Sequence, residues 1–279
     1  MIHINKLPSN SLPDIILDAF TVQDLPAIQL LQPEGWGDIL PGMRFYLNND
    51  YCFKVKASCN NKIVGTGIAI IHHNLAWISG IIVQPDFRNK GIGFAITNHL
   101  IKKLNGKCSS FLLVATKLGK PVYERLNFVN DGEYLFFTKG KINVPLSDYI
   151  ISYKEQYKND IFRLDLLVTG EQRKHLLEPL LKKAFLYIEN NKLTGYLLAG
   201  FGEGLIIAEN PVAGTELMKL NLLEEKTPVV HEENKTAIDF LLLHGFSIDY
   251  SRVASRMYCG KKINWNPQCV FSRMGGNLG

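Results

Sequence analysis

Residues 76–104 constrain the fold of this chain more than any other stretch. Residues 76–83 are rich in β-branched and aromatic side chains and end shortly before Pro85, which predicts a buried strand. A short segment with the pattern Arg88-x-x-Gly91-x-Gly93 follows. Apolar residues then recur at the spacing of one helix face: Ile92, Ile96, Leu100 and Leu104. The sequence therefore predicts a strand, a tight loop and a helix in immediate succession.

The glycine-containing loop has the properties of an anion site. Gly91 and Gly93 lack the Cβ atoms that would keep a ligand away from the backbone. The N–H groups at the start of the following helix point outward, and the helix dipole favours negative charge there. We therefore expect the loop to bind a pyrophosphate, and a valine at Gly91 to abolish that binding without disturbing the fold. The alternative is an ordinary strand–helix turn with two permissive glycines.

Two other classes of glycine loop fit this segment less well. The dinucleotide fingerprint G-x-G-x-x-G requires a glycine where this chain has Ile96. The phosphate loop G-x-x-x-x-G-K-S/T is not the pattern of this segment either. The choice of family therefore depends on the residues beyond the loop.

A second motif lies at residues 115–128 and reads Ala115-Thr116-x-x-Gly119-x-x-Val122-Tyr123-x-x-Leu126-x-Phe128. Together with the glycine loop after Val-x-Pro, it resembles the GNAT acetyltransferases, in which the second motif usually reads A-T-x-x-G-x-x-L-Y-x-x-L-G-F. Asn127 stands where the family usually has glycine. Asparagine tolerates the left-handed conformation at a helix end, so we expect the cap to survive. The resemblance covers about residues 14–140.

The rest of the first half fits the order of elements that this resemblance implies. We expect a helix opened by Thr21, with an acidic residue three positions later, and a hairpin that turns at Asn60 and Asn61. Strands are expected at residues 14–20, 51–57, 62–71 and 110–116, a helix at 122–126, and last strands within 128–138, interrupted at 130–132. The implied fold class is α+β, with the mixed sheet of a GNAT domain.

The second half repeats two segments of the first half but lacks the glycine-loop pattern. Residues 190–195 mirror residues 60–65 at an offset of 130, and residues 241–246 mirror residues 123–128 at an offset of 118. Residues 209–214 stand where the glycine loop should be and lack its pattern, and Leu241 stands in the place of Tyr123. Chance similarity of two Asn-Asn-Lys turns is the alternative.

We therefore expect tandem GNAT-like domains joined by a connector at about residues 140–150. The first, residues 1–142, has a full acetyl-CoA site, and the second, residues 143–279, is a degenerate copy. The chain as a whole is similar to a two-domain GNAT subgroup with such a copy and a closing Gly-Gly-x-x-Gly tail.

The resemblance implies acetyl-CoA as donor and a primary amine as acceptor. The residues expected to contact the pyrophosphate are Arg88, Asn89, Lys90, Gly91, Ile92 and Gly93, and those expected to pair with the pantetheine arm are Ile81, Ile82 and Val83. The strands of Ile82 and Val114 should splay apart to admit that arm, and an N–H near Ile82 is the expected oxyanion donor. Tyr123 is the expected general acid for the leaving thiolate, with packing under a helix as its alternative role.

The acceptor pocket is the least determined part of the site. Residues assigned to it are Glu34, Trp36, His73 and Trp77. The possible bases for the amine proton are His72, His73, Glu34 and Glu124, and a water relay is the other option. The two histidines fall in a predicted turn, where an exposed polar residue is the simpler interpretation, and a single tryptophan is more often part of a core.

Composition excludes several other classes of function. The net charge is +5 without a basic stripe, which argues against a nucleic-acid partner. Five cysteines without a C-x-x-C pattern favour a reducing cytoplasm, and no metal-ligand spacing occurs. No apolar run reaches the length of a membrane span. The prediction is an acetyl-CoA-dependent N-acetyltransferase that acts by direct transfer on a small molecule or peptide; the alternatives are a non-catalytic acyl-CoA-binding or regulatory module and a transferase of a longer acyl group.

Overall fold

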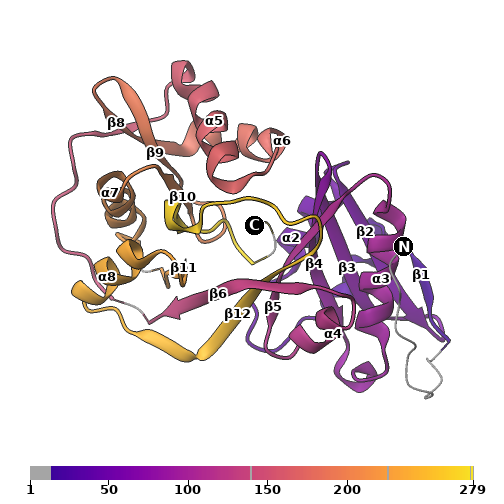
Figure 1. The fold of residues 1–279 in the computed structure, drawn as a ribbon. Coiled ribbons are helices and arrows are strands. Elements are labelled where there is room, and N and C mark those ends of the chain that lie inside the picture. Colours follow the sequence, from indigo (N-terminus) through magenta and orange to yellow (C-terminus); the bar gives the residue numbers. More distant parts are fainter. Residues whose placement is uncertain (1–13, 139, 225, 277, 279) are drawn as a thin grey trace. The chain divides into compact units, whose positions relative to one another are not determined.

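The structure is a computed structural model that describes residues 14–138, 140–224, 226–276 and 278. Its contacts divide the chain into two compact units, shown in Figure 1. The first unit is Met1–Val129 with Met257–Lys262, and the second unit is Asn130–Arg256 with Ile263–Gly279. Among the described residues, no helix is both long and apolar enough to cross a membrane.

The first unit is a mixed sheet with helices on both faces. Its strands are β1 (Ile16–Asp18), β2 (Cys52–Cys59), β3 (Lys62–His72), β4 (Leu75–Val83) and β5 (Ser110–Thr116). Its helices are α1 (Leu25–Gln29), α2 (Leu40–Leu47), α3 (Ile92–Leu104) and α4 (Lys120–Glu124), with 3-10 turns at Val22–Asp24 and Pro85–Phe87. Strands β1 to β4 are antiparallel neighbours, and β5 is parallel to β4. The predicted α+β class is confirmed.

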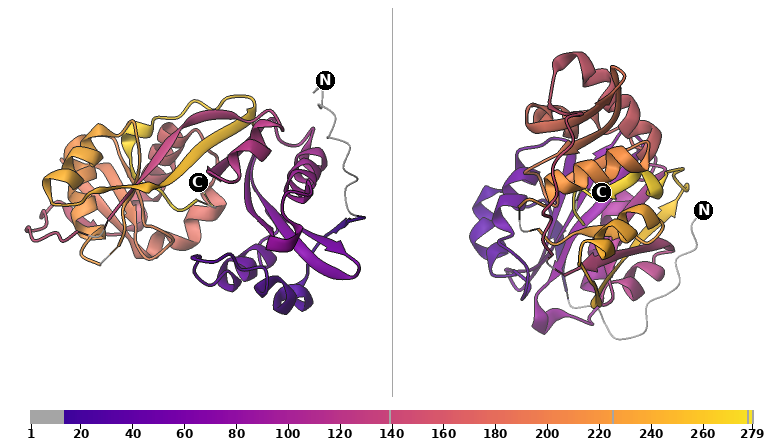
Figure 2. Two further views of the ribbon diagram at one scale, coloured as in Figure 1. Left: turned by 90° about the horizontal axis from the view of Figure 1, so that it is seen from below. Right: turned by 90° about the vertical axis from the view of Figure 1, so that its left-hand side faces the viewer.

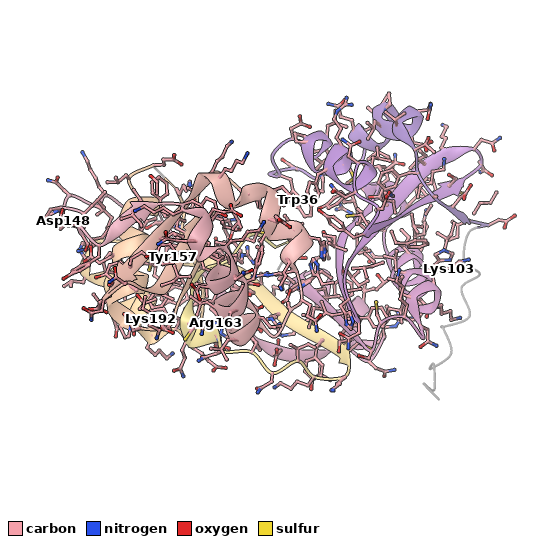
Figure 3. The ribbon with its side chains drawn as sticks, turned by 90° about the horizontal axis from the view of Figure 1, so that it is seen from above. Trp36, Lys103, Asp148, Tyr157, Arg163 and Lys192 are labelled. Atoms are coloured by element: carbon pink, nitrogen blue, oxygen red, sulfur yellow. The ribbon has the colours of Figure 1, made fainter. Side chains whose placement is uncertain are left out.

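The two faces of this sheet are covered by different helices (Figure 2). Helix α3 covers one face, because a Cβ at Gly67 would meet the side chain of Ile96. A Cβ at Gly80 would instead approach Met43 of α2, on the opposite face. The apolar stripe predicted for α3 is buried, while Lys103 lies on its exposed side (Figure 3).

Local turn chemistry follows the sequence closely in this unit. Thr21 opens the first helical turn, and its N–H donates to the carboxylate of Asp24 at 2.7 Å. Asn60 and Asn61 have φ values of 48° and 60°, which is the left-handed pair that a tight hairpin turn requires. The predicted helix opening and hairpin turn are both present.

The end of the first half differs from the prediction. Strand β6 (Val129–Phe137) runs without the interruption expected at residues 130–132, because Gly132 takes up a φ of 103° within the strand. Strand β12 (Ile248–Gly260) reaches β5 at its C-terminal end. There the N–H of Lys261 donates to the carbonyl of Ser109 at 2.8 Å, so residues 257–262 complete the sheet of the first unit.

The second unit repeats the element order of the first. Besides most of β6 and β12, its strands are β7 (Ile150–Ser152), β8 (Ala184–Glu189), β9 (Lys192–Leu198), β10 (Leu205–Ala208), β11 (Val229–His231) and β13 (Val270–Ser272). Its helices are α5 (Lys158–Thr169), α6 (Lys174–Leu177), α7 (Pro211–Asn221) and α8 (Lys235–Leu243), with 3-10 turns at Glu155–Tyr157, Glu178–Lys183 and Pro267–Cys269. The domain boundary between residues 142 and 143 stays a prediction.

The repeated hairpins agree in detail. Asn190 and Asn191 have φ values of 50° and 61°, nearly those of the equivalent asparagines in the first unit. The register of β2 with β3 shifts after Ala57, and that of β8 with β9 shifts after Tyr187, again at an offset of 130. Two turns that resembled one another by chance would not be expected to share the same bulge.

Candidate functional site

In the first unit as the structure describes it, part of one edge of strand β4 has no strand partner. Strand β5 pairs with β4 only from Leu75 opposite Ser110 to Trp77 opposite Leu112. Within the described strands, β4 continues to Val83 and β5 to Thr116 without further pairing between them. The two strands therefore separate as predicted, and the last residues of β4 keep one side unpaired.

Register identifies the peptide groups that face this open edge. The N–H of Gln84 donates to the carbonyl of Val64 at 2.9 Å on strand β3. Peptide groups alternate in direction along a strand, so Ile82, which lies opposite Thr66, also faces β3. Val83 therefore turns its N–H and carbonyl to the open side. The sequence predicts an oxyanion donor near Ile82. In the structure the N–H of Ile82 faces β3, whereas that of its neighbour Val83 faces the open edge.

A bulge at Gly80 exposes a second donor. The register of β3 with β4 shifts between Thr66 and Ile68, so Gly80 and Ile81 together oppose a single residue of β3. Gly80 has a φ of 56°, and a Cβ there would lie 2.3 Å from Cδ1 of Ile68. Only glycine fits this position, because both the backbone conformation and the packing exclude a side chain. Ile81 has no partner in the register with β3.

The glycine loop comes directly at the end of the open edge. The Nε of Arg88 donates to the carbonyl of Val83 at 3.2 Å, which ties the loop to the strand. Lys90 donates through Nζ to the carbonyl of Asp86 at 2.8 Å and lies over the ring of Phe87. These contacts place two cationic side chains at the start of α3.

The start of α3 presents a row of unused donors. The N–H of Ala95 makes the first helical hydrogen bond, to the carbonyl of Gly91 at 2.9 Å. In the part of the chain that the structure describes, the N–H groups of residues 89–94 have no acceptor. Free N–H groups and two cations at a helix N-terminus are suited to a pyrophosphate.

The structure constrains the two glycine positions of the loop differently. Gly91 is the N-cap of α3 and has a φ of 78°, so any side chain there would strain the backbone. The expectation that valine at Gly91 leaves the fold intact therefore needs correction. Gly93 is helical, and a Cβ there would lie 3.8 Å from both Ile81 and Val83, which is ordinary contact. Packing therefore does not require glycine at position 93.

Tyr123 lies at the same end of the sheet as the glycine loop. Helix α4 follows the C-terminal end of β5, and the C-terminal ends of parallel strands meet at one edge. Arg125, just after α4, lies over the ring of Phe94 in the first turn of α3, with 5.2 Å between guanidinium carbon and ring centroid. The structure thus brings Tyr123 to the side of the expected cofactor loop.

The phenol of Tyr123 is buried and keeps its proton over a wide pH range. Burial raises the pKa of Tyr123 to about 12, because a phenolate would lose its hydration there. Its ring packs edge-on against the ring of Phe128, with 5.9 Å between the ring centroids. A Cβ at Gly119 would lie 3.1 Å from Cε2 of the Tyr123 ring. No hydrogen-bond partner for the hydroxyl occurs among the described residues. The group is therefore protonated at neutral pH.

The residues assigned to the acceptor pocket are scattered. Glu34 and Trp36 are exposed in the loop between α1 and α2, where Trp36 is labelled in Figure 3. His73 is exposed in the turn before β4, beyond the end of the strand opposite Val83, and the strand from Leu75 to Val83 is about 26 Å long at roughly 3.3 Å per residue. Trp77 is buried within β4. His72, for which the sequence favours exposure, is instead buried at the end of β3.

Sequence reasoning missed two polar residues beside the bulge in β4. Thr66 is fully buried and donates through Oγ1 to the carbonyl of Gly80 at 3.0 Å. Ser79 is buried directly before the bulge, and its Oγ has no partner within the described chain. A glycine in the middle of a predicted strand is the available signal, since such glycines often mark a bulge.

The second unit lacks each of these features. The side chain of Asn210 accepts from the N–H of Ala213 at 2.9 Å, and Pro211 has no N–H to offer, so the start of α7 is already capped. Strand β13 pairs with the edge of β10 that corresponds to the open edge of β4. Leu241 stands at the position that corresponds to Tyr123. The helix start and the strand edge that correspond to those of the first unit are therefore occupied by Asn210 and by β13.

Comparison with known proteins agrees with this geometry. Residues 17–128 match the model of the acetyltransferase (GNAT) family. No curated protein matches the chain in sequence. Among solved structures, a putative acetyltransferase from Pyrococcus horikoshii aligns over 100% of this chain and 99% of its own, with a TM-score of 0.80 and 18% identity.

Two further structures share the fold at lower similarity. A GCN5-related N-acetyltransferase from Sphaerobacter thermophilus aligns over 92% of this chain and 99% of its own, with a TM-score of 0.63 and 12% identity. A fungal glucosamine N-acetyltransferase region of a multi-domain beta-N-acetylglucosaminidase aligns over 91% of this chain and 39% of its own, with a TM-score of 0.63 and 12% identity. These likenesses concern the fold. The match of the family model, with the loop and edge described above, identifies residues 17–128 as an acetyltransferase domain of the GNAT family.

Proposed function

We propose that the first unit transfers an acetyl group from acetyl-CoA to a primary amine of a small molecule or peptide. The observation that carries this proposal is the continuity of the open β4 edge with the unused N–H groups of residues 89–94. An extended pantetheine arm can pair with Ile81 and Val83, and its pyrophosphate then meets the start of α3. Family membership supports acyl transfer in general, and the choice of acetyl donor and amine acceptor is our proposal.

The proposed reaction is a direct transfer. The amine nitrogen attacks the thioester carbonyl, the new C–N bond forms, and the C–S bond breaks. The carbonyl oxygen becomes negative on the way, and a backbone N–H at the open edge stabilises it. Tyr123 gives its phenolic proton to the departing thiolate, and the proton lost by the amine leaves through water.

The second unit, in this proposal, has no cofactor role. Its capped helix and filled strand edge support the interpretation of a degenerate copy. Glu34 and Trp36 remain proposed acceptor contacts, because both are exposed in a loop of the first unit. The burial of Trp77 favours a core role for that residue.

The test is a screen of amines with acetyl-CoA that detects release of free thiol. Amino sugars belong in the panel because the fungal neighbour is named for glucosamine, together with polyamines and peptides with a free N-terminus. We expect thiol release that depends on one amine class. Binding of acetyl-CoA without transfer to any amine would favour the alternative of a non-catalytic acyl-CoA-binding module. Faster turnover of a longer acyl-CoA would favour the other alternative.

A further inference from the structure

The peptide that joins Gly80 to Ile81 is held by one hydrogen bond from a neighbouring strand. Thr66 on β3 is completely buried, and its Oγ1 donates to the carbonyl oxygen of Gly80 at 3.0 Å. The bulge removes this peptide from the regular ladder, so the ladder itself does not fix its orientation. Glycine is the most flexible residue, and Gly80 alone would leave the peptide plane free to rotate.

The direction of the Ile81 N–H follows from planarity. In a trans peptide the carbonyl of one residue and the N–H of the next point in opposite directions. Because the Gly80 carbonyl points to Thr66 on β3, the Ile81 N–H points away from β3, to the open edge of β4. The hydroxyl of Thr66 therefore fixes the direction of this donor, although Thr66 is bonded to the Gly80 carbonyl and not to the Ile81 N–H.

We propose that Thr66 is a positioning residue for acyl transfer, acting through the Gly80 carbonyl to aim the Ile81 N–H at the thioester oxygen. The inference rests on the proposed function of the same site. An oxyanion donor is effective only when it is oriented before the reaction begins, and removing one costs about 10²–10³-fold in kcat. A donor that is present but free to turn loses part of that effect.

The experiment compares three versions of the full chain. Thr66→Val keeps the shape of the side chain and removes the hydroxyl, whereas Thr66→Ser keeps the hydroxyl and removes the methyl group. We expect Thr66→Val to lower kcat by about 10–100-fold, a part of the full donor effect. KM for acetyl-CoA and the affinity for CoA should stay close to wild type, and Thr66→Ser should restore kcat. A purely structural role would lower the melting temperature of both variants without separating kcat from KM.

A second measurement reads the amide directly and needs no acceptor. The NMR resonance of the Ile81 N–H should move further on binding acetyl-CoA than on binding CoA, because only the former carries the thioester oxygen. That difference should disappear in Thr66→Val and persist in Thr66→Ser. If Thr66→Val does not fold, Thr66→Ala is judged by the same comparison.

The outcomes distinguish the role of Thr66 from the proposed function. Equal kcat in wild type and Thr66→Val, or an unchanged Ile81 difference in that variant, overturns the role of Thr66 and leaves the proposed function standing. Failure of the wild-type chain to bind acetyl-CoA overturns both.

Discussion

Tyr123 and Leu241 occupy the same position in two repeated helix ends. The carbonyl of Tyr123 accepts the N–H of Phe128, and the carbonyl of Leu241 accepts the N–H of Phe246, both at 3.0 Å. Each helix end closes through a left-handed residue, Asn127 in one copy and Gly245 in the other. The two helix ends thus share the same backbone hydrogen bond, while the phenol is present only in the first unit.

This relationship leads to a prediction about stoichiometry. We expect one CoA to bind per chain, because the second unit has a capped helix start and a strand on the corresponding edge. Calorimetric titration gives the number of sites. Two sites per chain would show that the second unit binds a cofactor despite those features.

The loop glycines should respond differently to substitution. Gly93→Ala adds a Cβ that the protein accommodates, so we expect an unchanged melting temperature and a loss of CoA affinity of at least about tenfold, or roughly 1.4 kcal/mol. Gly91→Ala forces a side chain onto a φ of 78°, which costs about 1–2 kcal/mol, and should lower both stability and affinity. Thermal melts and titrations of the two variants provide the comparison. Full affinity in Gly93→Ala would mean that no ligand approaches that position.

Tyr123→Phe should slow transfer without weakening cofactor binding. The ring and its contact with Phe128 remain, and only the proton donor is lost. We expect kcat to fall by roughly 10²–10⁴-fold, with little change in affinity for acetyl-CoA. Tyr250→Phe is the control, because that side chain is 82% exposed. Near wild-type kcat, with a normal pre-steady-state rate, would assign Tyr123 to packing alone.

The pH dependence of kcat provides an independent test of the same residue. Burial raises the pKa of Tyr123 from 10.0 to about 12, so the folded protein keeps the phenol protonated at a pH where an unfolded chain would lose the proton. Tyr123 should therefore cause no loss of kcat between pH 7 and pH 10. Its contribution to stability is present below pH 10 and is lost as the pH rises towards 12. A decline of kcat centred below pH 10 that vanishes in Tyr123→Phe would contradict this assignment.

Residues 257–262 should be essential to the stability of the first unit. Gly260 has a φ of 87°, and a Cβ there would lie 2.4 Å from the carbonyl oxygen of Ser109. Gly245 has a similar φ of 79° but open space around it. We expect Gly260→Ala to lower the melting temperature more than Gly245→Ala, because only the former adds a backbone clash to the strain of about 1–2 kcal/mol. Equal losses would indicate that the strand adapts.

The sequence by itself determined the features that depend on neighbouring residues. The glycine loop, the buried stripe of α3, the asparagine turn at residues 60–61 and the cap at Asn127 all follow from backbone preference and helical spacing. Such features need only a few adjacent residues, and the recurrence of the asparagine turn and of the helix end in the second half is what predicts a tandem arrangement.

Only the tertiary structure decided the features that join distant residues. The hydrogen bond of Thr66 to Gly80, the pairing of β13 with β10 and the return of residues 257–262 to β5 each connect residues that no local pattern relates. The burial of His72 and Trp77 is of the same kind, because a strand residue is covered only by the elements that pack over it. The sequence therefore located the proposed cofactor loop, whereas packing between strands decided which N–H groups face the open edge.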